Sequence, residues 1–391
     1  MEVKQIADIV NGMTTELLGE GAIQTEDLSN VVDMGTALFD NTSYDKFVKS
    51  LVDHIGRVMF VNRTYTGSTL ALRRDSWEYG AVMQKITELG LPEASENETW
   101  ELTDGASYDQ QVFYKAPVAS KFYNKRVTFE IDRSIADIQA RSAFDSASQL
   151  NAFISMLMSN IDKSISLKTE ALSERVINNM IAQTLKAEFP SVSNGNYSGM
   201  SGVKAVNLLY TYNQTFSKSL TYPACLYDED FLKWAAMTIR RYTVRLRKMS
   251  SLFNIGGQPR FTPSDLQHLI LHGDFSTAAE MYLQSDTFHN ELVSMPDFIE
   301  VPYWQGSGTD YATTSTTTIN ATIDVAGTPT TISTSGVLGV LFDHEACGIC
   351  CEERRVDTAY NAKANFTIYF YKEFANYYGD ANENFVVFYC A

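Results

Sequence analysis

The sequence predicts a mixed α+β fold that is organised around one very long helix. No glycine or proline occurs between residues 118 and 189. Apolar residues recur at steps of three and four positions from Leu150 to Met180, which is the period of an amphipathic helix. Just before it, alternating apolar and polar residues in 125–132 indicate a half-buried strand. At a rise of about 1.5 Å per residue, about 40 helical residues would span about 60 Å and form a backbone of the molecule.

The composition is that of a folded protein with an acidic surface. The chain has 391 residues, enough for two or three domains or for one large elaborated domain. Hydrophobic residues make up 45% and charged residues 20%, so the chain can bury a real core. The 31 Lys and Arg are outnumbered by 47 Asp and Glu, which gives a formal net charge of −16. This negative net charge argues against binding of nucleic acid through a general basic surface, although a local basic patch is compatible with the net charge.

The N-terminal region is predicted to be helical and to lack targeting segments. Residues 41–60 carry apolar side chains at helical spacing behind a polar start, which predicts an amphipathic helix. The first twenty residues contain charges and no apolar run of signal-peptide length, which argues against secretion. No run of about 18 consecutive apolar residues occurs, so we expect no membrane-spanning helix and no membrane partner.

The next segment, residues 67–117, predicts a long two-stranded excursion. Short alternating runs surround a polar, acidic tip at residues 90–98. An isolated two-stranded ribbon is marginal in water, and this one displays Trp77 and Trp100. We therefore expect the ribbon to lie against something else, either another part of its own domain or a neighbouring subunit.

A second region begins after Pro190, where the glycine-rich residues 191–202 predict a flexible connection and a domain boundary. Residues 228–248 then predict a helix with acids in its first turn and bases in its later turns, an order that complements the helix dipole. The basic residues are Arg240, Arg241, Arg245, Arg247 and Lys248. Such a cluster fits a solvated helix face, a bound phosphate or an acidic neighbouring subunit.

The segment from 261 to 353 is strongly acidic. It contains thirteen Asp and Glu but no Lys or Arg. It cannot form a nucleic-acid groove by itself, but it could pair with the basic helix of an identical neighbour. Within it, the Thr-, Ser- and Gly-rich residues 306–336 predict an exposed hairpin that turns at 326–328. The chain then returns to strands at 366–370 and 385–389.

Common catalytic motifs are absent from the sequence: it holds no G-x-x-x-x-G-K-[ST], G-x-G-x-x-G, G-x-S-x-G or H-E-x-x-H. Cys347, Cys350 and Cys351 form half of a tetrathiolate zinc site, but there is no second C-x-x-C, and Cys225 and Cys390 stand alone. Five cysteines, an odd number, suit free thiols in a reducing cytosol. We expect no metal and no cofactor, and a metal- or thiol-dependent enzyme is the less favoured alternative.

Two histidines lie in QHLILHGD, residues 267–274, which predicts a strand. The even separation of His268 and His272 places both on one face of that strand. Because nothing nearby in the sequence completes a ligand set, we expect a structural role for both.

The order of these parts, from about residue 27 to residue 391, resembles the major capsid proteins of tailed bacteriophages, which share the Hong Kong 97-like capsid fold with encapsulins. The segments that carry the resemblance are DSWEYGAVMQKITELGLPEASENETWELTDG, APVASKFYNKRVTFEIDRSIADIQ, HLILHGDFSTAAEMYLQSDTFHNELVSMPDFIEVPYW, GVLGVLFDHEACGI and NFTIYFYKEFANYYGDANENFVVF. The resemblance rests on the order of the segments and on their residue patterns along the whole chain, and on no single short motif.

The resemblance implies a division of the chain into the parts of that fold. These are an N-terminal arm at 1–66, an extended loop at 67–117, a peripheral domain with a spine helix at 118–200, an axial domain at 201–340 that includes the hairpin at 306–336, and a return to the peripheral domain at 341–391.

The resemblance also implies a structural function without catalysis. Copies would form hexamers and pentamers of an icosahedral shell around packaged double-stranded DNA, which an acidic lining would contain without sequence-specific binding. The subunit contacts would be made by Trp77, Trp100, Arg240, Arg241, Arg245 and Arg247. An encapsulin-like compartment that holds a cargo enzyme is the alternative within the same fold.

The implied partners are a scaffolding protein, a portal and a maturation protease, with assembly in the bacterial host cytoplasm and a final location in the virion. No scaffold-like helical segment precedes the arm, so a separate scaffold or a segment already removed would guide assembly. Some relatives join subunits through a lysine-to-asparagine isopeptide bond, for which Lys85 or Lys115 would be the lysine. No motif supports that bond here, so we assign no catalytic residue.

Overall fold

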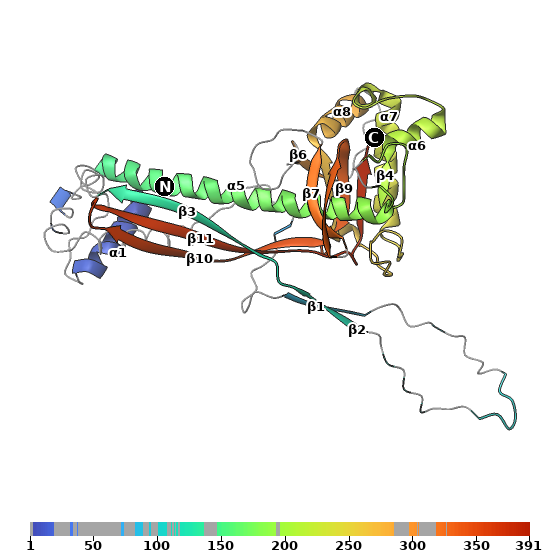
Figure 1. The fold of residues 1–391 in the computed structure, drawn as a ribbon, viewed down its shortest axis with the longest axis horizontal. Helices are drawn as coiled ribbons and strands as arrows, with labels where there is room; N and C mark the ends of the chain where they lie inside the picture. The colour runs from blue at the N-terminus through green and yellow to red at the C-terminus, as the bar shows by residue number, and fades with distance from the viewer. Residues whose placement is uncertain are drawn as a thin grey trace. The chain divides into compact units, whose positions relative to one another are not determined.

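Helices and strands both run throughout the chain, which confirms the predicted mixed α and β composition (Figure 1). The computed structural model describes residues 3–18, 32, 33, 37, 72, 73, 83–88, 94, 101–107, 111, 113, 115, 118–136, 147–192, 196–284, 297–302, 304, 318–325 and 327–391. The chain divides into two units. Unit 1 comprises Met1–Thr69, Arg126–Glu170 and Cys350–Asn376, and unit 2 comprises Leu70–Lys125, Ala171–Ile349 and Tyr377–Ala391.

Unit 1 is built on a three-stranded sheet in the order β10-β11-β3. Its strands are β3 (Arg126–Ala136), β10 (Cys347–Asn361) and β11 (Phe366–Gly379), and β11 runs antiparallel to β3. Side chains along β11 alternate between buried and half-buried, as expected for a strand with one covered face. The strand predicted at 125–132 is therefore confirmed. Unit 1 also holds the helix α1 (Val3–Leu18), which the sequence had not indicated.

The long helix predicted from the sequence is confirmed as α5 (Ala147–Glu188), with 42 residues. In its second half, the apolar residues of the predicted stripe are buried, among them Leu172, Val176 and Met180. The last turn is closed by Lys186, whose ammonium donates to the carbonyl oxygens of Pro190 at 2.8 Å and Val192 at 3.0 Å. A cation in this position satisfies carbonyls that have no partner within the helix.

Unit 2 contains a five-stranded sheet in the order β4-β12-β9-β5-β6. These strands are β4 (Ala205–Asn207), β5 (Gln267–His272), β6 (Ile299–Val301), β9 (Val337–Asp343) and β12 (Phe385–Tyr389). Every residue of β9 and β12 is buried, so both faces of the central strands are covered. Gly336 has a positive φ of 75°, and a Cβ there would collide with the carbonyl of Cys390, which explains the glycine.

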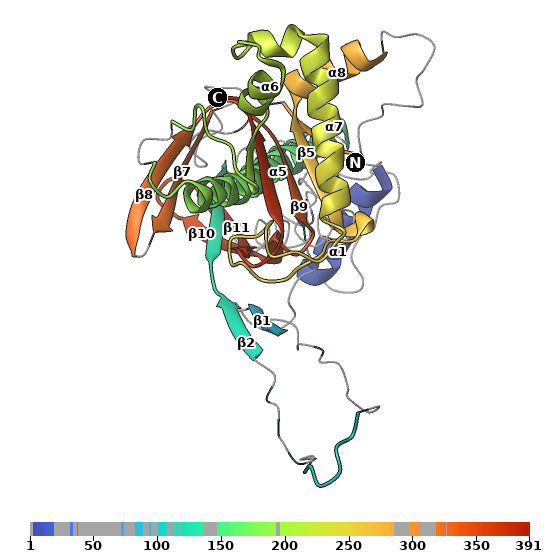
Figure 2. The same cartoon turned by 90° about the vertical axis from the view of Figure 1, so that its right-hand side faces the viewer.

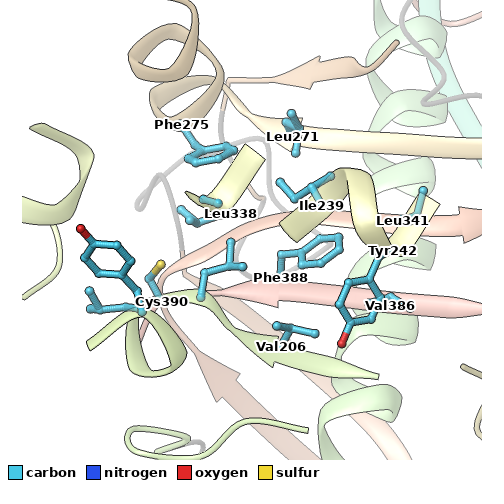
Figure 3. Packing of buried hydrophobic residues seen from close by; sticks show 14 of the residues in the cluster. Val206, Ile239, Tyr242, Leu271, Phe275, Leu338, Leu341, Val386, Phe388 and Cys390 are labelled. Atoms are coloured by element: carbon cyan, nitrogen blue, oxygen red, sulfur yellow. The ribbon is translucent and has the colours of Figure 1, made fainter. Parts of the chain in front are cut away.

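Helices α6 (Leu208–Phe216), α7 (Glu229–Arg245) and α8 (Gly273–Gln284) gather beside this sheet (Figure 2). Ile239 and Tyr242 of α7 point toward Leu341 and Phe388 of the sheet, and all four side chains are buried (Figure 3). The rings of Tyr242 and Phe388 meet edge to face, with their centroids 5.5 Å apart. This layer of helix and sheet side chains forms the core of unit 2.

The predicted hairpin is confirmed within residues 306–336, although its exposure is not as predicted. Strands β7 (Ile319–Val325) and β8 (Thr328–Thr334) pair antiparallel around Gly327, whose φ is 83°. One face of the hairpin is buried and carries Ile319, Ile323 and Ile332. Only the threonine-rich face is exposed, because a strand with period-two alternation divides its side chains between two faces.

Several predicted features lie outside the described residues. They include the helix predicted at 41–60, both tryptophans of the predicted loop, Trp77 and Trp100, and most of its acidic tip at 90–98.

The core of unit 2 generates a stability prediction. Phe388→Ala should lower the free energy of unfolding by about 3–5 kcal/mol, because the cavity replaces a buried ring between α7 and the sheet. Val244→Ala on the same helix, where the valine is 56% exposed, should change it by less than about 0.5 kcal/mol. Urea denaturation of unassembled subunits measures both values, and similar losses for the two variants would contradict this account of the core.

Candidate subunit interfaces

A two-stranded ribbon in unit 2 forms the described base of the predicted loop. Strand β1 (Met83–Glu88) pairs antiparallel with β2 (Val118–Tyr123), so that Lys85 lies opposite Lys121 (Figure 1). Only β1 lies within the segment predicted as the loop, 67–117, whereas its partner β2 begins directly after residue 117, beyond the predicted end. Residues directly opposite one another in a strand pair share a face, so the ribbon has two distinct faces.

The outer face of the ribbon exposes large apolar side chains, interspersed with the polar Gln84 and Ser120. Its apolar side chains are Ile86, Val118 and Phe122, which are 65%, 59% and 60% exposed. Large apolar side chains that remain in contact with water on one narrow face usually mark a surface that another molecule covers. Farther out in the loop, Leu102 and Phe113 are also exposed, at 64% and 86%.

The inner face of the ribbon binds carboxylates of its own chain. The Lys85 Nζ lies 2.8 Å from Glu383 Oε1 and 3.0 Å from Asp380 Oδ2. The Lys121 Nζ lies 3.2 Å from Asp380 Oδ1. We call these four residues the charge clamp. Because the Asp380 side chain is only 2% exposed, its carboxylate depends on these partners.

The turn between β11 and β12 holds the carboxylates in place. The Asp380 backbone N–H donates to the Ala346 carbonyl at 2.7 Å, and Asp380 Oδ1 accepts from the Asn382 N–H at 3.1 Å. Arg260 Nε lies 3.5 Å from Glu383 Oε1. An Asp that bonds the backbone two residues later is a common way to fix a tight turn.

The charge states of the clamp follow from these contacts. Burial of Lys85 acts to lower its pKa, but the hydrogen bond to Glu383 and the two carboxylate charges outweigh burial, so the pKa is raised. Burial of Asp380 acts to raise its pKa, but the charge of Lys85, the Asn382 N–H and Lys121 hold the pKa below its ordinary value. Lys85 therefore stays an ammonium ion, a state that is unfavourable for nucleophilic attack.

The basic residues near α7 form the second candidate interface. The helix begins at Glu229, where the Asp228 side chain accepts from the Phe231 N–H at 2.8 Å, and it ends at Arg245. Arg240, Arg241 and Arg245 are exposed on the helix as predicted. Arg247 and Lys248 were predicted within the helix, but they follow its end, because the chain tightens into a turn at Leu246.

An apolar and basic depression of about 330 Å³ lies on this exposed side of α7. It is lined by Met237, Arg240, Arg241, Val244 and Arg245. Within the part of the chain that the structure describes, none of these arginines pairs with a carboxylate. The depression therefore offers guanidinium groups without a carboxylate partner beside apolar surface, a combination that is common in the contact areas of proteins.

The acidic residues of 261–353 are mostly on the surface where they are described. Asp265, Asp274, Glu280, Glu300 and Glu345 are exposed, whereas Asp343 is buried. The opposite charges of unit 2 are thus both available to a neighbouring molecule.

The cysteines are free thiols, as predicted. Cys347 and Cys350 are buried and Cys351 is half-buried, and among the described residues no three His, Cys, Asp or Glu side chains are grouped to hold a metal ion. Cys225 and Cys390, which belong to no cysteine motif in the sequence, lie together in the buried core, where their side chains hydrogen-bond to each other. The fold joins β12 to the segment before α7, which sequence spacing could not show.

The strand predicted at the two histidines is confirmed. His268 and His272 lie on one strand, β5, and His268 contacts His344, whose Nδ1 lies 2.9 Å from its Nε2. His272 is fully buried, and its Nδ1 accepts from the Asp274 N–H at 3.2 Å. No local signal marked His344, since it lies 76 residues from His268.

These features define a class of protein: a mixed α and β chain with a long helix and a projecting ribbon, similar to phage capsid chains. One similar chain belongs to the "Capsid structure of Staphylococcus phage Andhra", with a TM-score of 0.51 and 9% identity over 84% of this chain and 87% of that chain. Two others are from bacteriophage P68, "Structure of head fiber and inner core protein gp22 of native bacteriophage P68" (TM-score 0.49, 9% identity, 84% and 88% covered), and from "Capsid structure of the Cyanophage P-SCSP1u" (0.45, 13%, 85% and 94%).

The family is shown by the sequence comparison. A family model described as Phi29-like phage major capsid protein matches residues 8–389. The chain therefore belongs to the Phi29-like phage major capsid protein family, which confirms the resemblance to tailed-phage major capsid proteins. No curated protein matches the chain. None of the helices in the described residues is both long and apolar enough to cross a membrane.

The charge clamp generates a pH prediction. Because the pKa of Asp380 is lowered in the folded state, its contribution to stability is present above the ordinary Asp pKa and is lost as pH falls through the folded pKa. At neutral pH, Asp380→Asn should lower the free energy of unfolding by roughly 2–4 kcal/mol. At pH about 3 the difference should shrink, because the carboxyl is then largely protonated in the unfolded chain and folding has to release that proton.

Urea denaturation of both proteins at the two pH values measures this difference. Glu229→Gln is the control, because Glu229 pairs with Lys233 at 2.6 Å in an exposed position and should matter little at either pH. A loss for Asp380→Asn that is equally large at both pH values would contradict the assigned role of its charge.

Proposed function

We propose that this chain forms the shell of a phage head, in which many copies assemble into hexamers and pentamers of an icosahedral capsid around packaged double-stranded DNA. Membership of a phage major capsid protein family makes it a structural protein of the virion capsid. The observation that carries the further proposal is the apolar outer face of the ribbon, which its own chain leaves exposed. A shell of identical subunits provides a neighbour that can cover this face.

The proposal keeps the Hong Kong 97-like arrangement that the sequence predicted, with its arm, extended loop, peripheral domain, axial domain and return. In it, α5 serves as the spine helix, α6, α7 and α8 with strands β4, β5 and β6 belong to the axial domain at 201–340, and β12 comes from the return at 341–391. The described base of the loop is ribbon-like, as an extended loop requires.

In the proposed shell, the ribbon lies across an adjacent subunit. Burial of Ile86, Val118 and Phe122, together with Trp77 and Trp100, would remove apolar area from water, which is the main favourable term in protein association. A ribbon of two strands has no core of its own in which to bury these side chains.

The basic face of α7 is proposed to meet acidic surface of the next copy in a capsomer. Closed rings of identical subunits use head-to-tail contacts, in which two different surfaces meet. One of the two surfaces is supplied by arginines of α7 that have no carboxylate partner in the described residues and lie beside apolar surface. They are Arg240, Arg241 and Arg245, and Arg247 lies next to them. Exposed acids such as Asp265 and Glu280 are available on the same unit of the neighbour.

The proposed role is non-enzymatic, with no cofactor. The partners are identical subunits, a scaffolding protein, a portal, a maturation protease and contained DNA, and assembly takes place in the host cytoplasm. An encapsulin-like compartment is the alternative within the same fold. The family match to phage capsid proteins favours the phage head over that alternative. Burial of Cys347 and Cys350 disfavours a thiol enzyme, because a catalytic thiol needs access to substrate.

The loop contact predicts that the outer face is needed for shells but not for folding. Ile86→Ser with Phe122→Ser, and separately Trp77→Ala with Trp100→Ala, should reduce closed shells at least about tenfold, because an apolar contact is lost from every copy. Electron microscopy of the full-length chain, produced alone and with the head proteins encoded beside it, counts the shells. Circular dichroism checks the fold of the unassembled subunit.

Ile86→Val with Phe122→Leu is the matched control, since it keeps the face apolar and should assemble like the wild type. Normal shells from the serine variant would contradict the proposed contact, and so would loss of the subunit fold in the serine and tryptophan variants alike.

The α7 contact predicts a dependence on salt. Reversal of Arg241, Arg245 and Arg247 to Glu should weaken capsomer formation most at low ionic strength, where like-charge repulsion is least screened. Each exposed pair is worth only about 0–1 kcal/mol, but the contact repeats around the ring. Counts of capsomers, empty shells and filled particles across a salt series measure the effect. A solvated face predicts little change and a DNA contact predicts normal empty shells, so normal capsomers at low salt would contradict the proposal.

A further inference from the structure

The charge clamp joins both strands of the ribbon to a single turn of the same chain. Lys85 comes from β1, Lys121 from β2, and both ammonium groups contact Asp380 in the turn between β11 and β12. We propose that Asp380 and Glu383 are positioning residues, which fix the direction and the roll of the ribbon before assembly and thereby present its apolar face to a second copy of the chain. The second half of this proposal rests on the proposed function.

The two lysines make the inner face of the ribbon selective for carboxylates. Lys85 and Lys121 lie directly opposite each other in the strand pair, and like charges in that position repel. Asp380 resolves the repulsion, because its two carboxylate oxygens contact one ammonium group each, at 3.0 Å and 3.2 Å. Glu383 adds a second carboxylate to Lys85 at 2.8 Å. No other face of the ribbon carries this pattern of charge.

The anchor itself is rigid. Three contacts tie the turn to two other segments of unit 2: Asp380 N–H donates to Ala346 O at 2.7 Å, Gly256 N–H donates to Ala381 O at 2.8 Å, and Arg260 of the same segment as Gly256 contacts Glu383. The fully buried strand β12 begins directly after the turn. A displacement of the carboxylates would therefore disturb the core, whereas the ribbon has no comparable attachment of its own.

Contacts on both strands fix an angle as well as a position. A single ion pair allows the attached element to pivot, but contacts from both of its paired, antiparallel strands to one carboxylate define the rotation of the ribbon about its long axis. Tyr123, the last residue of β2, adds an apolar contact on the same inner side: it is 8% exposed, and its ring lies 5.3 Å from that of Tyr378.

The rotation of the ribbon about its long axis determines which of its faces is accessible to other molecules. Without the clamp, the hydrophobic effect would favour turning Ile86, Val118 and Phe122 onto their own chain, which would hide them. With the lysines held against Asp380 and Glu383, these side chains must point away. The clamp thus acts by opposing the burial of the docking face within one subunit.

The test measures the ribbon's position in unassembled full-length subunits. Spin labels at Ser120→Cys on the outer face and Thr277→Cys on α8, both exposed, report one distance within unit 2. Cys351, which is only half-buried, is replaced by Ser, while the four buried thiols stay unlabelled. We expect a narrow distance distribution in this background. With Asp380→Asn and Glu383→Gln added, we expect a broad one, in which the original distance falls at least about tenfold in population.

Matched variants distinguish the effect of losing the clamp contacts from the effect of removing any other charge. Glu229→Gln removes an exposed ion pair of the same unit and should leave the distance unchanged. Lys121→Met removes one of the two attachments without touching the turn, and it should broaden the distribution even if the double variant fails to fold. An unchanged distribution in both Lys121→Met and the double variant would overturn the inference.

The same variants without labels test the consequence for assembly. We expect closed shells, counted by electron microscopy, to fall at least about tenfold for Asp380→Asn with Glu383→Gln and not for Glu229→Gln. Normal shell numbers despite a broad distance distribution would overturn the positioning role in assembly. If the wild-type chain forms no shells even with its head proteins, the proposed function fails, and the distance measurement still decides whether the clamp fixes the ribbon.

Discussion

A ribbon of two strands has two faces and no interior, and this constraint governs how the projecting part of this capsid protein can be used. One face carries two adjacent lysines, which are tolerated only beside carboxylates, and the turn at Asp380 supplies them. Once this face is occupied, the apolar face must remain in water until another molecule covers it. Electrostatics therefore fixes the inner face and leaves the hydrophobic effect to act between molecules.

The core of unit 2 gives the anchor its rigidity. Strands β9 and β12 are buried along their whole length, and side chains of α7 interlock with them. Because the anchoring turn lies directly before β12, its position is set by close packing that tolerates little displacement. The elements that carry the candidate contacts, the ribbon and the exposed side of α7, are in this way supported by one rigid layer.

Along the sequence of unit 2, the basic cluster of α7 is followed by a long acidic segment. Exposed arginines with no carboxylate partner in the described residues follow α7, whereas exposed acids follow from Asp265 onward. Individual contacts between such groups are weak and screened by salt, so the arrangement would be of little use in a monomer. In a ring of identical subunits the same contact recurs at every boundary, which suits the family to which the chain belongs.

The sequence by itself determined the elements whose signals are local, and through their order it indicated the family. The absence of glycine and proline with a helical period identified α5, and alternation around Gly327 identified the hairpin. Only the tertiary structure decided which residues that are distant in the sequence contact each other. Lys85 and Glu383 are 298 residues apart, and the contacts of His268 with His344 and of Cys225 with Cys390 also join segments that are distant in the sequence. Which of these groups meet depends on the order and register of strands in a sheet, and that is set by how whole faces bury together rather than by the residues next to each group.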